Sequence, residues 1–402
     1  MNKAKALLAA VVFLLLVVGV FQHFHDDPPP DLSRFSRPAH DPAAYAKVEA
    51  LSNAIKTHRR EYAAQNPGEP TSRDALFRLA LKRDDNAVRA LRRHLKTNEV
   101  ALSVARELIT LKTFSFPPWD DQTWPAPLFS FLIESHRLLL ADSLLAINEG
   151  RPDDAWMILC EGIESARVRD KASCSLVASA INLVCEKKLL ELLEALCAEE
   201  TDPKRLRFIL GRLEKSKPDP LSLFRTAVSG EMVYIADRLS RGGRVWGPTG
   251  HTPSPSNQTL REKAGEQVDN LHLYWLWMNT LPNATVANHA RIVDAELADP
   301  SPNRPIPPPT SDLFRLLRRN AGGLDAEKCL PEEISWCRAR CFDTRLRHDR
   351  LRLSIALRIY ALEHEGSHPA TLAELAPDLL PEVPVNVLDG KPFLYDPTTG
   401  SF

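Results

Sequence analysis

The residues that come nearest to a catalytic motif are His364, Glu365 and His368, which fit the pattern His-Glu-x-x-His. On an unbroken helix, two histidines one turn apart bind zinc and the glutamate activates a water molecule. Here Gly366 weakens the helix, and Pro369 disfavours helical geometry at the residue before it. The sequence therefore predicts a helix-ending turn, with a zinc-dependent hydrolase as the alternative.

Other motifs that carry chemistry are missing from the sequence. It contains no Gly-x-x-x-x-Gly-Lys-Ser/Thr, Gly-x-Gly-x-x-Gly, Gly-x-Ser-x-Gly or Cys-x-x-Cys pattern. Among the seven cysteines, Cys329, Cys337 and Cys341 could form one disulfide, and Cys337 and Cys341 could instead face a metal. The plain interpretation is that Cys337 and Cys341 are packed helical residues. We expect no catalytic residue, no cofactor, no bound metal and no enzymatic activity.

Three further segments have both a functional and a structural interpretation. The basic run from Arg338 to Arg352 could contact anionic lipid or an acidic partner, but the aspartates within it favour a solvated helix face. The proline- and tryptophan-rich stretch 114–127 is expected to cover the end of a helix layer, or to dock a partner. The aromatic run 271–277 is expected to be buried between helices.

The composition indicates a folded, helical protein. The chain has 402 residues, with 51 basic and 52 acidic side chains and a formal net charge of -1. This balance argues against a nucleic-acid partner or an acidic solvating tail. With 16 glycines, 32 prolines and 7% aromatic residues, the chain lacks the glycine turns of barrels, propellers and doubly wound nucleotide folds.

The N-terminus predicts a membrane anchor. Lys3 and Lys5 form a short cytoplasmic stub within residues 1–5, and an apolar segment over 6–24 follows, with aspartates after it. The apolar core is close to the length of a bilayer-spanning helix, and the flanking charges place the N-terminus in the cytoplasm. A cleaved signal peptide is the first alternative, although the end of the run makes a poor cleavage site, and a buried core helix is the second. A proline-rich spacer over 25–41 would then lift the body away from the membrane.

The body over residues 42–300 is expected to be an irregular array of helical hairpins, similar to tetratricopeptide repeats without their full 34-residue pattern. Apolar residues recur at helical spacing through most of it. Three helices are expected to begin at an Asp-Pro pair, at Asp41, Asp202 and Asp219.

The last part of the chain has a different character. A proline-rich linker over 301–310 precedes C-terminal helices and a cap within 311–402. Separate helices are expected near 313–320, 332–347 and 351–363. The cap is expected to contain a capping box opened by Thr371, and a hairpin of strands 385–387 and 393–395 around Asp389-Gly390. The fold class is therefore all-α with a small α+β cap.

The stretch LRIYALEHEGSHPATLAELAPDLLPEVPVNVLDGKPFLY resembles the globular end of the major, G-like pseudopilins of type II secretion. It is also similar to the C-terminus of a family of uncharacterised bacterial membrane-anchored helical proteins. The resemblance covers residues 351–402 and implies a role near a secretion or pilus-like machine. Residues 1–6 lack a prepilin-peptidase site, and a long helical body separates the anchor from the cap. The cap is therefore better explained as a borrowed packing unit.

These observations favour a single-pass bacterial inner-membrane protein with a periplasmic helical body that serves as a scaffold. Its expected partners are membrane lipid, through the N-terminal helix, and at least one protein. The alternatives are an accessory component of a type II secretion or pilus-like machine, and the zinc hydrolase that uses His364, Glu365 and His368.

Overall fold

The computed structural model describes residues 28–35, 40–65, 80–81, 83–116, 126–172, 175–240, 282–302 and 321–402. The predicted anchor over 6–24, the aromatic run 271–277, the helix 313–320 and most of the linker 301–310 lie outside these residues. Within the described ranges, no helix is both long enough and apolar enough to cross a membrane.

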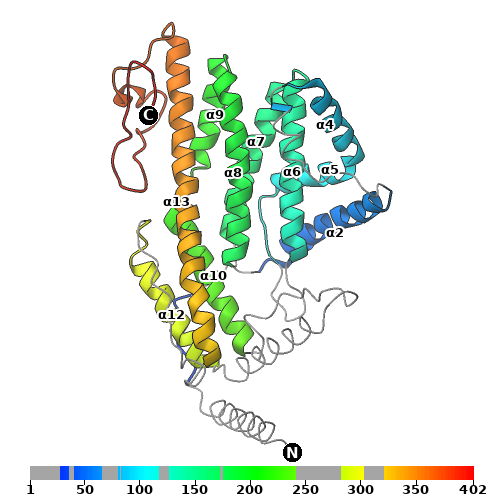
Figure 1. Cartoon of the computed structure of the whole chain (residues 1–402), viewed down its shortest axis with the longest axis vertical. Helices are drawn as coiled ribbons and strands as arrows, with labels where there is room; N and C mark the ends of the chain where they lie inside the picture. The colour runs from blue at the N-terminus through cyan, green and yellow to red at the C-terminus, as the bar shows by residue number, and fades with distance from the viewer. Residues whose placement is uncertain are drawn as a thin grey trace, which may run out of the picture. The chain divides into compact units, whose positions relative to one another are not determined.

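The described residues are mostly α-helical, which confirms the predicted helical class (Figure 1). The helices are α2 (Pro42–Gln65), α4 (Asp85–Thr97), α5 (Glu99–Thr110), α6 (Ala126–Asn148), α7 (Pro152–Ala172), α8 (Leu176–Glu199), α9 (Pro203–Lys215), α10 (Pro220–Ser240), α12 (Pro282–Ala298) and α13 (Ala321–Glu363), with a short 3-10 helix, η2 (Leu372–Leu375).

The three predicted Asp-Pro helix starts are confirmed. Proline is the first residue of α2, α9 and α10, where its fixed φ suits the helix and its missing N–H is not needed. In each case the preceding aspartate accepts hydrogen bonds from free backbone N–H groups of the first turn. The Asp41 carboxylate, for example, lies 3.0 Å from the backbone nitrogens of Ala43 and Ala44.

The chain divides into two compact units that do not follow its order. Unit 1 comprises Met1–Arg37 and Val228–Trp336, and unit 2 comprises Pro38–Ala227 and Cys337–Phe402, so the boundaries fall inside α10 and α13. In unit 1, the apolar face of α12 is buried through Val286, Ala290 and Val293. The Arg34 guanidinium donates two hydrogen bonds to the Asp294 carboxylate and ties the described part of the spacer to α12.

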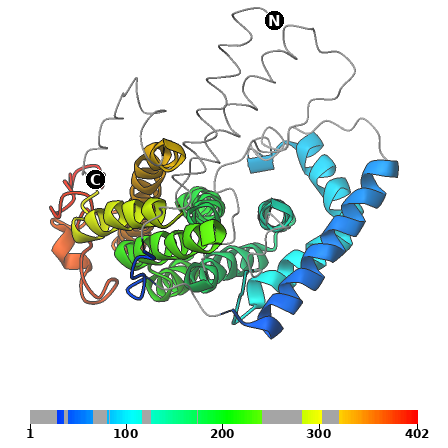
Figure 2. The same cartoon turned by 90° about the horizontal axis from the view of Figure 1, so that it is seen from below.

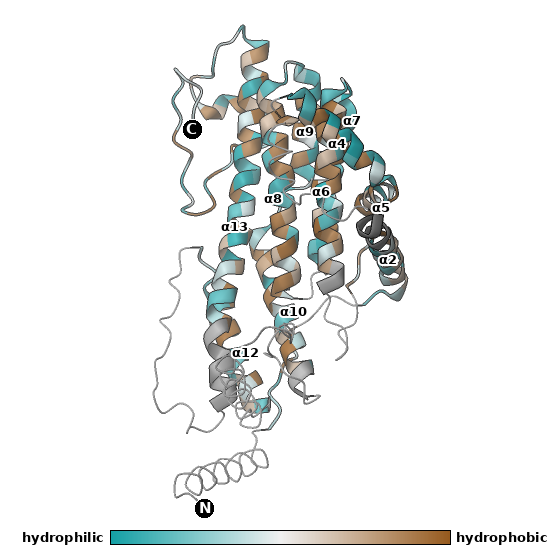
Figure 3. Ribbon diagram, turned by 45° about the vertical axis from the view of Figure 1, so that its right-hand side comes forward, coloured by the Kyte–Doolittle hydropathy of each residue, from teal (hydrophilic) through white to brown (hydrophobic). Residues whose placement is uncertain are grey.

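Unit 2 contains the helical array. Helix α6 packs against α7 and α7 against α8, while α5 packs on α6, α2 on α5 and α9 on α7 (Figures 1 and 2). Leu139, Leu159 and Leu189, one from each central helix, are fully buried. The hydropathy of α8 is largely apolar, whereas α4 is largely polar and buries only a narrow stripe (Figure 3). The predicted hairpin-like packing is therefore present.

The end of the chain departs from prediction in two ways. The separate helices expected over 332–347 and 351–363 form one helix, α13, because the intervening residues contain neither glycine nor proline. The predicted strands are absent from residues 364–402, where only two isolated bridges form, Val385 with Pro392 and Asp396 with Ser401. The predicted turn is present, since the backbone N–H of Gly390 donates to Asn386 at 2.7 Å.

Candidate functional site

The His-Glu-x-x-His segment lies just beyond the end of α13. Glu365 and Gly366 have φ values of +57° and +86°, so the chain leaves the helix between the two histidines. The backbone N–H of Gly366 donates to the carbonyl of Ala361 at 2.8 Å, which closes the helix end. The segment is thus the helix-ending turn that its glycine and proline predict.

The two histidines of this segment have different surroundings. The His364 ring stacks on Tyr360, with ring centroids 4.0 Å apart, and its Nδ1 lies 2.8 Å from the Tyr360 carbonyl oxygen. The His368 ring lies against Gly400, where an added Cβ would come within 2.6 Å of its Nδ1. In the part of the chain that the structure describes, no three His, Cys, Asp or Glu side chains are placed to hold a metal ion.

The basic run from Arg338 to Arg352 is only partly the solvated face that the sequence favours: Arg350 is exposed, but Arg338 and Arg352 are each only 1% exposed. For Arg352 the prediction was wrong because a partner comes from elsewhere in the chain: its Nη2 contacts the Glu214 carboxylate at the end of α9. Spacing within the run could not reveal this distant carboxylate.

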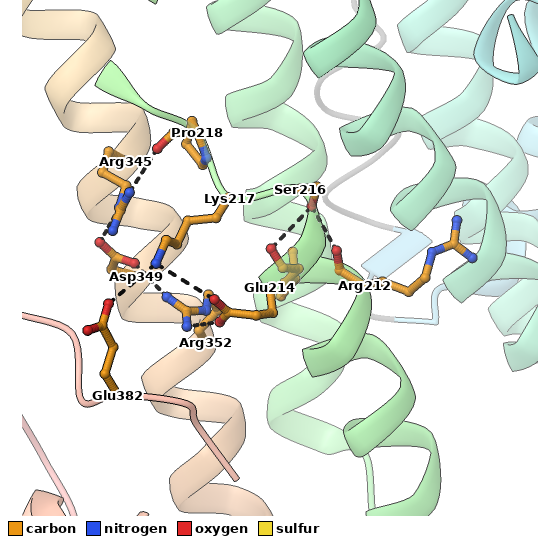
Figure 4. Close-up of polar contacts among 10 residues, drawn as sticks. Arg212, Glu214, Ser216, Lys217, Pro218, Arg345, Asp349, Arg352 and Glu382 are labelled. Carbon is orange, nitrogen blue, oxygen red and sulfur yellow. Dashed lines mark hydrogen bonds and ion pairs between the residues drawn. The ribbon is translucent and has the colours of Figure 1, made fainter. Parts of the chain in front are cut away.

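We call the group around this arginine the Arg352 cluster; its members are Glu214, Lys217, Arg345, Asp349, Arg352 and Glu382 (Figure 4). Asp349 lies at its centre and is buried. Its carboxylate accepts from Arg345 Nε at 2.5 Å and from Arg352 Nη1 at 2.8 Å. One carboxylate is therefore shared by two guanidinium groups.

The outer members of the Arg352 cluster connect α13 to other segments of unit 2. Lys217 lies 3.7 Å from both Glu214 and Glu382, and Arg345 donates to the Pro218 carbonyl at 2.9 Å (Figure 4). Burial raises the pKa of Asp349, and the facing Arg345 opposes this without cancelling it. The cluster therefore ties the turn between α9 and α10, and the residues after η2, to one point on α13.

A second group, the Arg167 cluster, lies between α7 and α8 and consists of Arg167, Asp170 and Glu186. The Arg167 guanidinium contacts Glu186 through Nη2 and lies 2.8 Å from Asp170 through Nη1. Glu186 is fully buried and Asp170 is buried. Here one guanidinium is shared by two carboxylates.

A neighbouring arginine, Arg169, adds positive charge without forming an ion pair within the described residues. It is buried and donates to three neutral acceptors: Asn182 Oδ1 at 2.7 Å, Ser165 Oγ at 2.7 Å and His136 Nε2 at 2.9 Å. His136 Nδ1 in turn lies 2.7 Å from the Leu132 carbonyl, so Nδ1 carries the proton and Nε2 accepts. Burial and the facing Arg169 lower the pKa of His136 to about 3.

The pKa values of the two carboxyl groups in the Arg167 cluster are raised, whereas that of His136 is lowered. Burial raises the pKa of Glu186 to about 7, although Arg167 opposes the shift and Asp170 adds to it. Burial also raises the pKa of Asp170, while Arg167 and a hydrogen bond from Asn182 oppose the rise. Charged groups lose their hydration when buried, so the neutral acid is favoured wherever pairing is incomplete.

Helix α13 contributes two further buried side chains near Arg167. The Arg167 guanidinium acts electrostatically on the Cys341 thiol and on the His348 ring, which are both on α13. Both ring nitrogens of His348 and Glu186 Oε1 are buried without a hydrogen-bond partner among the described residues. Cys160, Cys185, Cys197, Cys337 and Cys341 are free and buried, as expected for packed helical residues. The side chain of Cys329 lies outside the described residues.

The Arg167 cluster and its neighbours are indicated in the sequence by polar residues at core positions of helices, although these residues form no known motif. Asn182 and Glu186 are spaced i, i+4 within the apolar pattern of α8, and His136 interrupts the apolar face of α6. Polar residues at positions that the helical period assigns to the core are expected to find each other.

No protein-family model, curated protein or solved structure matches the chain.

Proposed function

We propose that this protein is a membrane-anchored, extracytoplasmic helical scaffold that binds another protein. The observation that carries the proposal is that the charged groups of unit 2 with the most strongly shifted pKa values form contacts that join helices to one another. Buried ion pairs that connect several helices fix a rigid array, and such arrays present extended surfaces to partners. The anchor is supported by the apolar segment 6–24 and its flanking charges.

The outer face of α9 is the surface we expect a partner to contact. Phe208 is 46% exposed, and Met157 on the adjacent α7 is 37% exposed. The Arg212 guanidinium lies 5.6 Å from the Phe208 ring and its Nη1 lies 3.6 Å from the Met157 sulfur. Lys204 and Lys215 are exposed along the same helix, whereas Arg207 pairs with Glu363 and Arg212 with Glu164. Exposed apolar side chains among positive charges suit an acidic protein surface that carries an apolar anchor residue.

Localisation is tested by fusing a reporter that is active only outside the cytoplasm to the C-terminus of the full chain. The proposal predicts an active, membrane-bound fusion. Removal of residues 1–27 should abolish reporter activity and release the fusion from the membrane. An active cytoplasmic reporter at the same position would contradict the proposal.

The contact face is tested with a photo-crosslinking amino acid at position 208 in living cells, with position 99 as the matched exposed control on α5. We expect a discrete adduct from position 208, weakened by high salt, and none from position 99. The same adducts at both positions, or none at either, would contradict the proposed surface.

A role as an accessory component of a type II secretion or pilus-like machine is the second candidate. It is supported by the cap, in which the Thr371 backbone N–H donates to Glu374 Oε1 at 3.0 Å and a turn closes at Gly390. If this role applies, the adduct from position 208 should contain a component of that machine.

A further inference from the structure

The Arg167 cluster contains one more carboxylate than its guanidinium can fully pair. Arg167 contacts both Asp170 and Glu186, whereas Arg169 directs its donors to neutral groups. Asp170 has a second donor, because the Asn182 amide contacts its carboxylate. Glu186 has only Arg167 as a donor, and its Oε1 has no hydrogen-bond partner among the described residues. Asp170 Oδ2 also lacks a hydrogen bond, but it lies 2.8 Å from Arg167 Nη1. Glu186 is therefore the less stabilised of the two anions.

We propose that the Arg167 cluster is a proton-sensing element of unit 2: Glu186 binds a proton as the solution becomes acidic, and this proton tightens the packing of α8 against α7. The element responds to the medium around the protein body and goes beyond the proposed scaffold role.

Among the titratable groups around the cluster, Glu186 is the one we expect to bind and release a proton. The charged and titratable groups around the cluster are His136 and Arg137 on α6, Arg167, Arg169 and Asp170 on α7, Cys185 on α8, Cys341, Arg345 and His348 on α13, and Lys217 after α9. The His136 tautomer is fixed by Leu132 and Arg169, so a second proton would face a guanidinium. His348 is fully buried beside positive charges, which keeps it neutral.

The physical consequence follows from burial. When Glu186 is ionised, a fully enclosed oxygen carries charge without a donor, and local opening that admits water relieves this cost. When Glu186 is protonated, Arg167 is left with Asp170 as a one-to-one pair, and the enclosed state is favoured. The proton bound by Glu186 is thus linked to the closed packing of α7 and α8.

The test is hydrogen exchange of α8 backbone amides in the full chain at about pH 5 and about pH 8, corrected for intrinsic exchange rates. Since burial raises the pKa of Glu186 from 4.5 to about 7, the closed state binds the proton more tightly than the open state. Protection should therefore be at least about tenfold higher at the lower pH, because one pKa unit corresponds to a factor of ten.

The variant Glu186→Gln keeps an oxygen that can accept from Arg167 and removes the charge. Its protection should stay close to the low-pH level of the wild type at both pH values. Glu191→Gln, at a partly exposed position of the same helix, is the matched control and should retain the wild-type pH dependence. The same pH dependence in Glu186→Gln as in the wild type would overturn the proposal.

A second measurement on the wild type covers the case in which Glu186→Gln does not fold. Infrared difference spectra between about pH 5 and about pH 8 should show a protonated, buried carboxyl group losing its proton within this interval. If every carboxyl group is already ionised at about pH 5, the proposal is overturned.

Discussion

The two ionic clusters of unit 2 share their central charged group in opposite ways. In the Arg352 cluster, Asp349 is shared by Arg345 and Arg352, so the central anion has two cations. In the Arg167 cluster, Arg167 is shared by Asp170 and Glu186, so the central cation has two anions. The cations of the Arg352 cluster also reach Glu214 and a backbone carbonyl, whereas Glu186 keeps an oxygen without a partner among the described residues.

This difference decides which cluster responds to pH. The Arg352 cluster has three cations and three anions, so each of its carboxylates has a cation, and its arginines stay protonated at all ordinary pH values. An excess of carboxylates can be relieved by gaining a proton. The two clusters are therefore expected to serve different purposes: the Arg352 cluster holds segments together at all ordinary pH values, and the Arg167 cluster forms a proton-linked contact.

The largest loss of folding stability is expected from Arg167→Met. This change leaves Asp170 and Glu186 buried without their shared cation, and uncompensated buried charge costs about 3–5 kcal/mol. Urea unfolding at about pH 7 should show this loss, and the loss should shrink in acid as the carboxylates become neutral. A destabilisation below about 1 kcal/mol would show that the cluster is not closed as described.

Asp349→Asn should have a smaller effect of about 2–3 kcal/mol, because the amide directs a donor at one of two guanidinium groups but Arg352 retains Glu214. Urea unfolding measures it, with Asp343→Asn, in the more exposed pair with Arg347, as the control. If both variants are equally stable, Asp349 does not hold the cluster together.

The smallest effect is expected from Lys217→Met at the edge of the Arg352 cluster. Its ion pairs with Glu214 and Glu382 are 3.7 Å long and partly exposed, and such pairs contribute less than about 1 kcal/mol. Thermal unfolding at low and high salt should differ little from wild type. A loss of stability as large as that of Asp349→Asn would mean that residues at the edge of the cluster contribute as much as those at its centre.

The sequence predicted the helical elements better than it predicted their interior chemistry. Helix starts at Asp41, Asp202 and Asp219, and the helix end near Gly366, follow from local backbone preferences and were correct. The burial of Arg338 and Arg352 was missed because the Arg352 partner Glu214 lies far away in the chain. The predicted strands near Asp389-Gly390 do not form. Pro384 and Pro392 remove backbone donors there, so a ladder cannot extend past one bridge.

For the Arg167 cluster, the burial of residues can be predicted from the sequence, but their ion pairing cannot. His136 is buried on α6 and Glu186 is buried on α8, each at a position where the helical period places apolar residues. Periodicity therefore assigns both residues to the interior. It does not reveal that Arg167 must serve two carboxylates, because that depends on how α7 and α8 are rotated against each other.

The most direct test of the central claim is the free energy of unfolding from about pH 4 to about pH 8 for the wild type and Glu186→Gln. Because the folded-state pKa of Glu186 is raised from 4.5 to about 7, its contribution to stability is fully present below the lower value and is lost as pH rises toward the upper one. The account predicts that Glu186→Gln is the more stable of the two at about pH 8. This advantage should disappear at about pH 4. Parallel pH profiles would show that Glu186 binds no proton in this range and would contradict the account.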